Sequence, residues 1–175
     1  MDNLRDHLMY AAVFGWFSFV WFGWAQEAPP AAWRAWLGSG AVLGLITGIV
    51  GGYLSYQHWH AASALNSNRN FQWYLVFFVA ELSLALVGAL VLFYLHKADQ
   101  VVEWVSLVVA VHFIGLKFVF DDSALFGLAG LMLLVLIFAY PMATHFQVAL
   151  SAVIGAANGI LLLGFAWLGF LRFLM

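Results

Sequence analysis

The chain contains no cysteine and very few charged residues. Without cysteine, disulfides, thiolate metal ligands and cysteine nucleophiles are excluded from these 175 residues. Charged residues make up 8% of the chain, whereas an ordinary soluble domain carries about 25%. Water is therefore not the main solvent of this protein. The net charge of −2 offers no basis for binding nucleic acid, and we expect no such partner.

Hydrophobic residues, in contrast, make up 66% of the chain and are grouped into six long runs. About 20 apolar residues in a helix cross a hydrocarbon core of about 30 Å. The sequence therefore predicts an all-α polytopic membrane protein whose main partner is the lipid bilayer. We expect a bundle of six transmembrane helices in one domain spanning residues 1–175, with helices at about 8–24, 36–56, 72–95, 101–120, 124–141 and 147–171.

The few basic residues predict the orientation. Six spans place both termini on the same side of the membrane. That side holds Arg5, Arg69 and Arg172, with Lys117 close to it, and the other side holds Arg34 and Lys97. Because Lys and Arg accumulate on the cytoplasmic side, we expect both termini in the cytoplasm. The predicted location is the cell membrane (plasma or inner), crossed several times.

Glycines recur at a helical spacing in two of the runs. The residues predicted to pack against a neighbouring helix are Gly40, Gly44, Gly48 and Gly52 in the second run, and Gly155 and Gly159, with a GxxxG spacing, in the sixth. Small residues allow helices to approach closely in lipid, where no hydrophobic drive joins them. The neighbouring helix belongs either to the same chain, which we favour, or to a second copy, which would give a homodimer.

Two ionisable residues lie deep in the predicted spans. Glu81 is near the middle of the third run and His112 is near the middle of the fourth. A charge at the centre of a transmembrane helix costs about 2.5–3.5 kcal/mol on insertion scales. An acid and an imidazole at matching depth reduce each other's cost and can carry a proton. We therefore predict that Glu81 and His112 face each other inside the bundle.

Three further polar residues complete a candidate polar core: Tyr74, Thr47 and Asn158. The whole set is a candidate for ligand binding or proton relay. A purely structural interpretation competes with this one, because polar side chains also join transmembrane helices by hydrogen bonds worth about 1 kcal/mol. The sequence alone does not decide between the two.

No metal or cofactor site is predicted. His58 and His60 lie two residues apart in a polar loop, with no third ligand near them in sequence. An axial haem pair needs two histidines at matching depth, and only His112 is deep. An intramembrane enzyme or haem protein is a third interpretation, which these histidine positions do not favour. We therefore expect no catalytic residues and no cofactor.

The fourth run resembles a known pattern. Its residues Val111-His112-Phe113-Ile114-Gly115-Leu116, followed by Phe120, are similar to the H-F-x-x-L-x-x-x-F helix of small six-helix bacterial membrane proteins of uncharacterised function. That family often has proline at the position of Gly115 and a small residue at the position of Lys117. The resemblance covers about ten residues and the general layout. It implies a bacterial integral membrane protein with an inward-facing His112, and it implies no substrate.

The favoured function is a small transporter or channel for an unknown small solute. Its polar site near the bilayer midplane would be coupled to protons through Glu81 and His112, since secondary transporters place their sites at this depth. The alternative is a non-transporting accessory or assembly protein that presents a helix surface to a partner. A tightly packed interior would favour this alternative.

Overall fold

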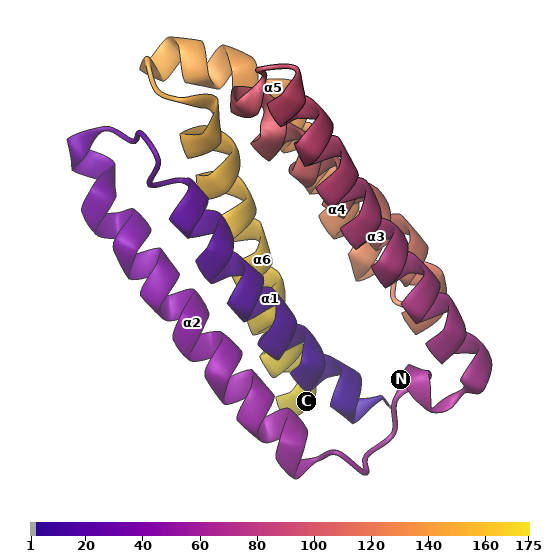
Figure 1. Cartoon of the computed structure of the whole chain (residues 1–175). Coiled ribbons are helices and arrows are strands. Elements are labelled where there is room, and N and C mark those ends of the chain that lie inside the picture. The colour runs from indigo at the N-terminus through magenta and orange to yellow at the C-terminus, as the bar shows by residue number, and fades with distance from the viewer. Residues whose placement is uncertain (1–2) are drawn as a thin grey trace. The chain divides into compact units, whose positions relative to one another are not determined.

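The computed structural model describes residues 3–175, which form helices and connecting turns with no strand among them. The all-α prediction is confirmed. The long helices in Figure 1 are α1 (Leu4–Trp24), α2 (Arg34–Gln57), α3 (Asn68–Tyr94), α4 (Val101–Phe120), α5 (Ala124–Phe146) and α6 (Leu150–Leu174). Single 3₁₀ turns, η1 (Ala31–Trp33), η2 (Ala64–Asn66) and η3 (Ala98–Gln100), precede α2, α3 and α4.

Five helical segments are long and apolar enough to cross a membrane. They are Ala31–Gln57, Asn68–Tyr94, Ala98–Phe120, Ala124–Phe146 and Leu150–Leu174. α1 is long enough, at 21 residues. However, its first turns carry Arg5, Asp6 and His7, and its Trp, Ser and Gly residues lower its mean hydropathy. The structure therefore supports a multi-pass membrane protein, while the span assigned to α1 stays a prediction.

The surface of α3 also fits a lipid environment. None of its residues is buried, and Leu82, Leu86 and Val87 are each more than half exposed. A helix with so many exposed large apolar side chains would be a liability in water. In a bilayer the same side chains contact lipid tails, which are as apolar as they are.

The described chain forms two compact units. The terminal unit contains residues 3–63 and Gly155–Met175, and the central unit contains Ala64–Ile154. The terminal unit thus holds α1, α2 and most of α6, and the central unit holds α3, α4 and α5. The prediction of one domain over residues 1–175 stays a prediction, and we describe the two three-helix units separately.

In the terminal unit, α1 packs against both α2 and α6. A Cβ placed on Gly155 would lie 2.6 Å from the backbone nitrogen of Ala25, and one placed on Gly169 would lie 2.6 Å from the carbonyl oxygen of His7. The end of α6 therefore lies beside the start of α1, so the two helices are antiparallel. The start of α1 and the end of α6 consequently lie at the same end of this unit.

Ser18 and Phe22 fill the interior of the terminal unit. The Ser18 hydroxyl donates a buried hydrogen bond of 2.8 Å to the carbonyl oxygen of Gly159 on α6. One turn further along α1, the Phe22 ring covers both Gly40 on α2 and Gly159 on α6. The ring is only 2% exposed. α1 therefore joins the other two helices of this unit.

The glycines of α2 contact α1 along a line that differs from the predicted stripe. Gly44 and Gly48 meet the backbone of α1 as expected, but a Cβ on Gly52 would have no atom within 4 Å. Gly51 takes its place, because its Cβ would lie 2.5 Å from the backbone nitrogen of Ala12. Steps of four residues rotate a contact line by about 40° each, and one step of three returns it by about 60°. The predicted spacing therefore fails at its fourth member.

Five of the six predicted glycines are covered within the chain. α1 occupies the space beside Gly40, Gly44 and Gly48 of α2 and beside Gly155 and Gly159 of α6. This arrangement favours the in-chain interpretation of the glycine pattern. A second copy cannot reach these five positions while α1 covers them.

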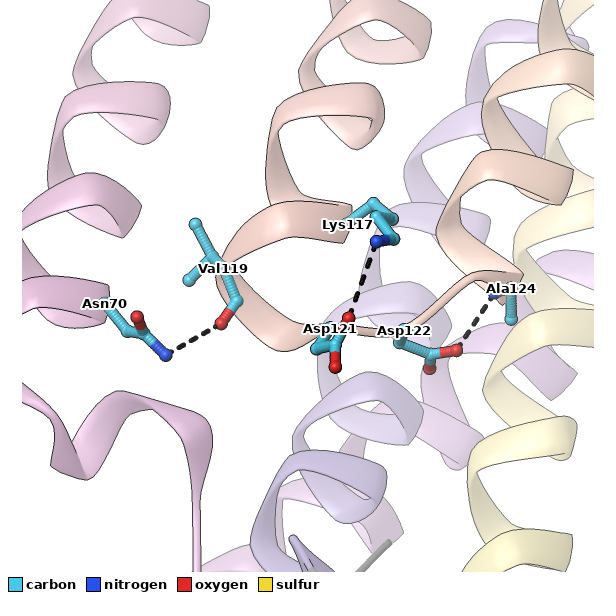
Figure 2. Close-up of polar contacts among 6 residues, drawn as sticks. All are labelled: Asn70, Lys117, Val119, Asp121, Asp122 and Ala124. Carbon is cyan, nitrogen blue, oxygen red and sulfur yellow. Dashed lines mark hydrogen bonds and ion pairs between the residues drawn. The ribbon is translucent and has the colours of Figure 1, made fainter.

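In the central unit, α4 packs between α3 and α5. α4 ends where Asp121 adopts a left-handed backbone with φ of 48°. The Asp122 carboxylate then accepts a hydrogen bond of 2.9 Å from the backbone N–H of Ala124, at the start of α5 (Figure 2). Nζ of Lys117, one turn before Asp121, lies 3.4 Å from Asp121 Oδ1. This short connection makes α4 and α5 adjacent in the sequence and in space.

α5 continues five residues beyond Pro141, whereas the predicted fifth helix ended at about residue 141. The Thr144 hydroxyl lies within hydrogen-bond distance of the carbonyl oxygens of Tyr140 (3.1 Å) and Pro141 (2.9 Å). The helix ends at Phe146, and the next residue, Gln147, caps it with a left-handed backbone whose φ is 54°.

Gly51→Ala and Gly52→Ala form a matched test of the α1–α2 contact. Alanine is a better helix former than glycine by about 1 kcal/mol at both positions. At Gly51 the new methyl group collides with the backbone of α1, and overpacking of this kind costs about 1–3 kcal/mol. We expect Gly51→Ala to unfold more readily than Gly52→Ala in mixed detergent micelles, measured by far-UV circular dichroism. Equal stability of the two variants would contradict this packing.

Candidate site at Glu81 and His112

The candidate site lies on the two helices α3 and α4 of the central unit. Glu81 is thirteen residues from Asn68 and thirteen from Tyr94, at the centre of α3. His112 lies eleven residues after Val101, slightly beyond the centre of α4. Both helices belong to segments of membrane-spanning length. The two side chains therefore occupy the middle of their spans, as the sequence predicted.

The structure brings the two side chains together. His112 Nε2 lies 3.5 Å from Glu81 Oε2, and the side chains are 8% and 20% exposed. The other ring nitrogen, Nδ1, lies 3.2 Å from the carbonyl oxygen of Phe77. Phe77 precedes Glu81 by one helical turn. Both nitrogens of the imidazole therefore meet groups of α3.

These contacts define how many protons the pair holds. A carbonyl oxygen only accepts hydrogen bonds, so Nδ1 of His112 carries a hydrogen toward Phe77. The contact between Nε2 and Oε2 is then favourable with one proton between them, on either atom. With that proton the pair has no net charge, and without it the pair is an anion. Low-dielectric surroundings favour the neutral form.

Two glycines make room for the aromatic rings beside this pair. A Cβ on Gly115 of α4 would lie 2.5 Å from the Phe77 ring. A Cβ on Gly88 of α3 would collide with the pyrrole edge of the Trp104 indole. The absence of a side chain at each glycine thus lets a ring from the opposite helix enter the interface. The rings and glycines hold α3 and α4 at the spacing that the pair requires.

Two further polar side chains, which were not among the predicted site residues, join α3 and α4. Asn70 Nδ2 donates to the carbonyl oxygens of Val119 (3.0 Å) and Ala64 (3.2 Å), near one end of the helix pair (Figure 2). Trp104 Nε1 donates a hydrogen bond of 2.9 Å to the carbonyl oxygen of Leu84. Tryptophan near the end of a transmembrane helix often lies at the headgroup level, but the indole N–H of Trp104 is turned onto α3. The sequence signal for this contact was Gly88, a glycine of α3 that leaves room for the Trp104 ring of the neighbouring helix.

The remaining predicted residues are divided between the two units. Tyr74 lies on α3, two turns before Glu81, and its ring contacts Phe78 and Phe120. Thr47 and Asn158 belong to the terminal unit, where they are 4% and 0% exposed. The structure therefore groups Tyr74 with Glu81 and His112 in the central unit. It does not assign Thr47 or Asn158 to the same site.

Comparisons with protein families, with characterised proteins and with solved structures find no match to this chain. The resemblance of the fourth helix to small bacterial membrane proteins therefore stays a resemblance. Within residues 3–175 no group of three His, Asp or Glu side chains is arranged to hold a metal ion. The site is consequently described by the chemistry of its own residues.

The tautomer of His112 provides a direct test of this geometry. In protein labelled with ¹⁵N-histidine, we expect Nδ1 of His112 to be protonated, because Phe77 offers only an acceptor. Glu81→Gln should leave Nδ1 protonated and move the Nε2 resonance, since only Nε2 faces residue 81. A His112→Asn variant identifies the signal in the NMR spectrum. A deprotonated Nδ1 would show that the ring does not bond to Phe77.

Proposed function

We propose that this protein is a small multi-pass membrane transporter whose central site couples solute movement to a proton. The observation that supports the proposal is the 3.5 Å contact between Glu81 and His112 in the middle of two helices of membrane-spanning length. Ionisable residues at such depth are rare, and they mark proton and ion pathways in membrane proteins. The solute itself is unidentified.

The proton count suggests the form of the coupling. The pair is neutral with one shared proton and anionic without it, so release of the proton leaves an uncompensated charge in a low-dielectric site. A monovalent cation that replaces the proton restores neutrality. Electroneutral exchange of a proton for a monovalent cation is therefore the cycle that these two side chains favour.

The proposed setting is the cell membrane, with both termini in the cytoplasm. An even number of spans places the two ends of the chain on one side, and both ends lie together within the terminal unit. The excess of Lys and Arg assigned to that side favours the cytoplasmic face. This orientation includes α1 as the sixth span.

A second candidate is a non-transporting accessory protein in which the pair only joins helices. One observation favours it. The contacts made by Asn70 and Trp104 also link α3 to α4, and neither group is ionisable near neutral pH. The Glu81–His112 contact then belongs to a series of structural polar contacts, each worth about 1 kcal/mol in a membrane.

Proton exchange in proteoliposomes separates the two candidates. Vesicles containing the purified protein and an internal pH dye are given a pH gradient, and Na⁺, K⁺ or tetramethylammonium is added outside. We expect at least one cation to collapse the gradient through the wild-type protein. Glu81→Gln and His112→Gln should each slow this collapse by at least about tenfold, because neither variant can share a proton between the helices.

Asn70→Ala is the matched control. It removes a polar contact between the same two helices but no ionisable group. Under the transport proposal Asn70→Ala retains exchange, even if its stability falls. Under the structural alternative all three variants lower stability to a similar degree, and none of the proteins, wild type included, exchanges protons. Exchange that is unchanged in both Glu81→Gln and His112→Gln would also contradict the transport proposal.

A further inference from the structure

A groove lies on the central unit, away from the Glu81–His112 contact. Its volume is about 360 Å³, and its walls come from α3, η3, α4 and α5. The residues that line it are Leu92, Gln100, Glu103, Trp104, Leu107 and Leu136. Small-molecule sites are usually clefts of about 300–1,000 Å³ with mainly apolar walls and a few polar groups. The volume of this groove lies within that range, and its lining is mainly apolar, with Gln100 and Glu103 as its polar residues.

The polar end of the groove is negative. Glu103 lies in the first turn of α4, and Asp99 precedes it by four residues. Among residues 3–175, the Glu103 carboxylate forms no ion pair and accepts no hydrogen bond. Lys97, the nearest basic residue in sequence, is exposed in the preceding loop. A carboxylate with no partner in the wall of a mainly apolar groove favours a cationic ligand.

Trp104 gives the groove a rigid aromatic wall. Its indole N–H is bonded to Leu84 on α3, and the ring enters the space beside Gly88. Of the aromatic side chains, tryptophan binds organic cations most strongly through its ring face. The ring is therefore held in place before any ligand arrives, and Trp104 and Glu103 both line the groove.

We infer that this groove binds an organic cation, with an ammonium group at Glu103 and Trp104 and an apolar chain along Leu92, Leu107 and Leu136. The leucines provide the contact surface for the chain, and the carboxylate provides the charge. Because Glu103 lies in the first turn of a membrane-length helix, the ammonium group sits near the headgroup level. The inference does not depend on the proposed function, since it uses neither Glu81 nor His112.

Binding of hexyltrimethylammonium tests the inference. The protein is placed in lipid nanodiscs and titrated by isothermal calorimetry, with empty nanodiscs subtracted. We expect saturable binding of one probe per chain. Hexanesulfonate has the same chain and the opposite charge, and it should bind at least about tenfold more weakly. Glu103→Gln keeps the size of the side chain and removes its charge, and it should weaken binding of the cation by about tenfold.

Two variants show where the probe binds. Glu27→Gln removes an exposed carboxylate of the terminal unit and should leave the affinity unchanged. Leu107→Trp adds bulk to the groove at a side chain that is 39% exposed, so it should abolish binding while the protein remains folded. The inference is overturned if the wild type shows no saturable binding, if Glu103→Gln binds the cation as tightly as the wild type, or if hexanesulfonate binds equally well.

A choline lipid headgroup and a free amphiphilic cation share this chemistry, and lipid composition distinguishes them. The titration is run in nanodiscs of phosphatidylcholine and in nanodiscs of an uncharged diglucosyl lipid. Equal affinity in the two lipids supports a free cation as the natural ligand. Weaker binding of the probe in phosphatidylcholine alone supports a choline headgroup that already occupies the groove.

Discussion

The structure of the central unit depends on one constraint: hydrocarbon offers no hydrogen bonds, so polar groups inside it must find partners in the protein. α3 is exposed to its surroundings over most of its surface, and its polar contacts are made with α4. Asn70 joins the two helices near one end, the Glu81–His112 pair joins them in the middle, and the Trp104 indole bonds to Leu84 further along. The glycines opposite the rings follow from the same constraint, because these contacts form only if the helices approach closely.

The terminal unit associates by a different means. Its helices meet through glycine and backbone, with the Ser18 hydroxyl bonded to the carbonyl oxygen of Gly159 and the Phe22 ring filling the space between α2 and α6. Close approach increases van der Waals contact, which is the main attraction available between apolar helices in lipid. The chain thus contains a unit packed through small residues and a unit linked by polar side chains. Within residues 3–175, the titratable groups at mid-span lie in the second of these units.

Much of the candidate site could be predicted because membrane burial makes ionisable residues conspicuous. Glu81 and His112 were identified by their depth alone, and their matching depth led to the prediction that they face each other. Trp104 and Asn70 were not identified, since a tryptophan and an asparagine near helix ends have ordinary roles at the headgroup level. Gly52 was chosen over Gly51 because a strict spacing of four ignores the rotation of the contact line around a helix.

By itself the sequence determined the helical class, the membrane environment, and the positions and approximate lengths of the helices, because hydrophobicity and length are local properties. The tertiary structure decided which small residues meet, which nitrogen of His112 bonds to Phe77, and that Thr47 and Asn158 lie in a different unit from Glu81. These facts depend on the rotation of each helix about its axis. Rotation is set by contacts between segments far apart in the chain, and no local pattern contains that information.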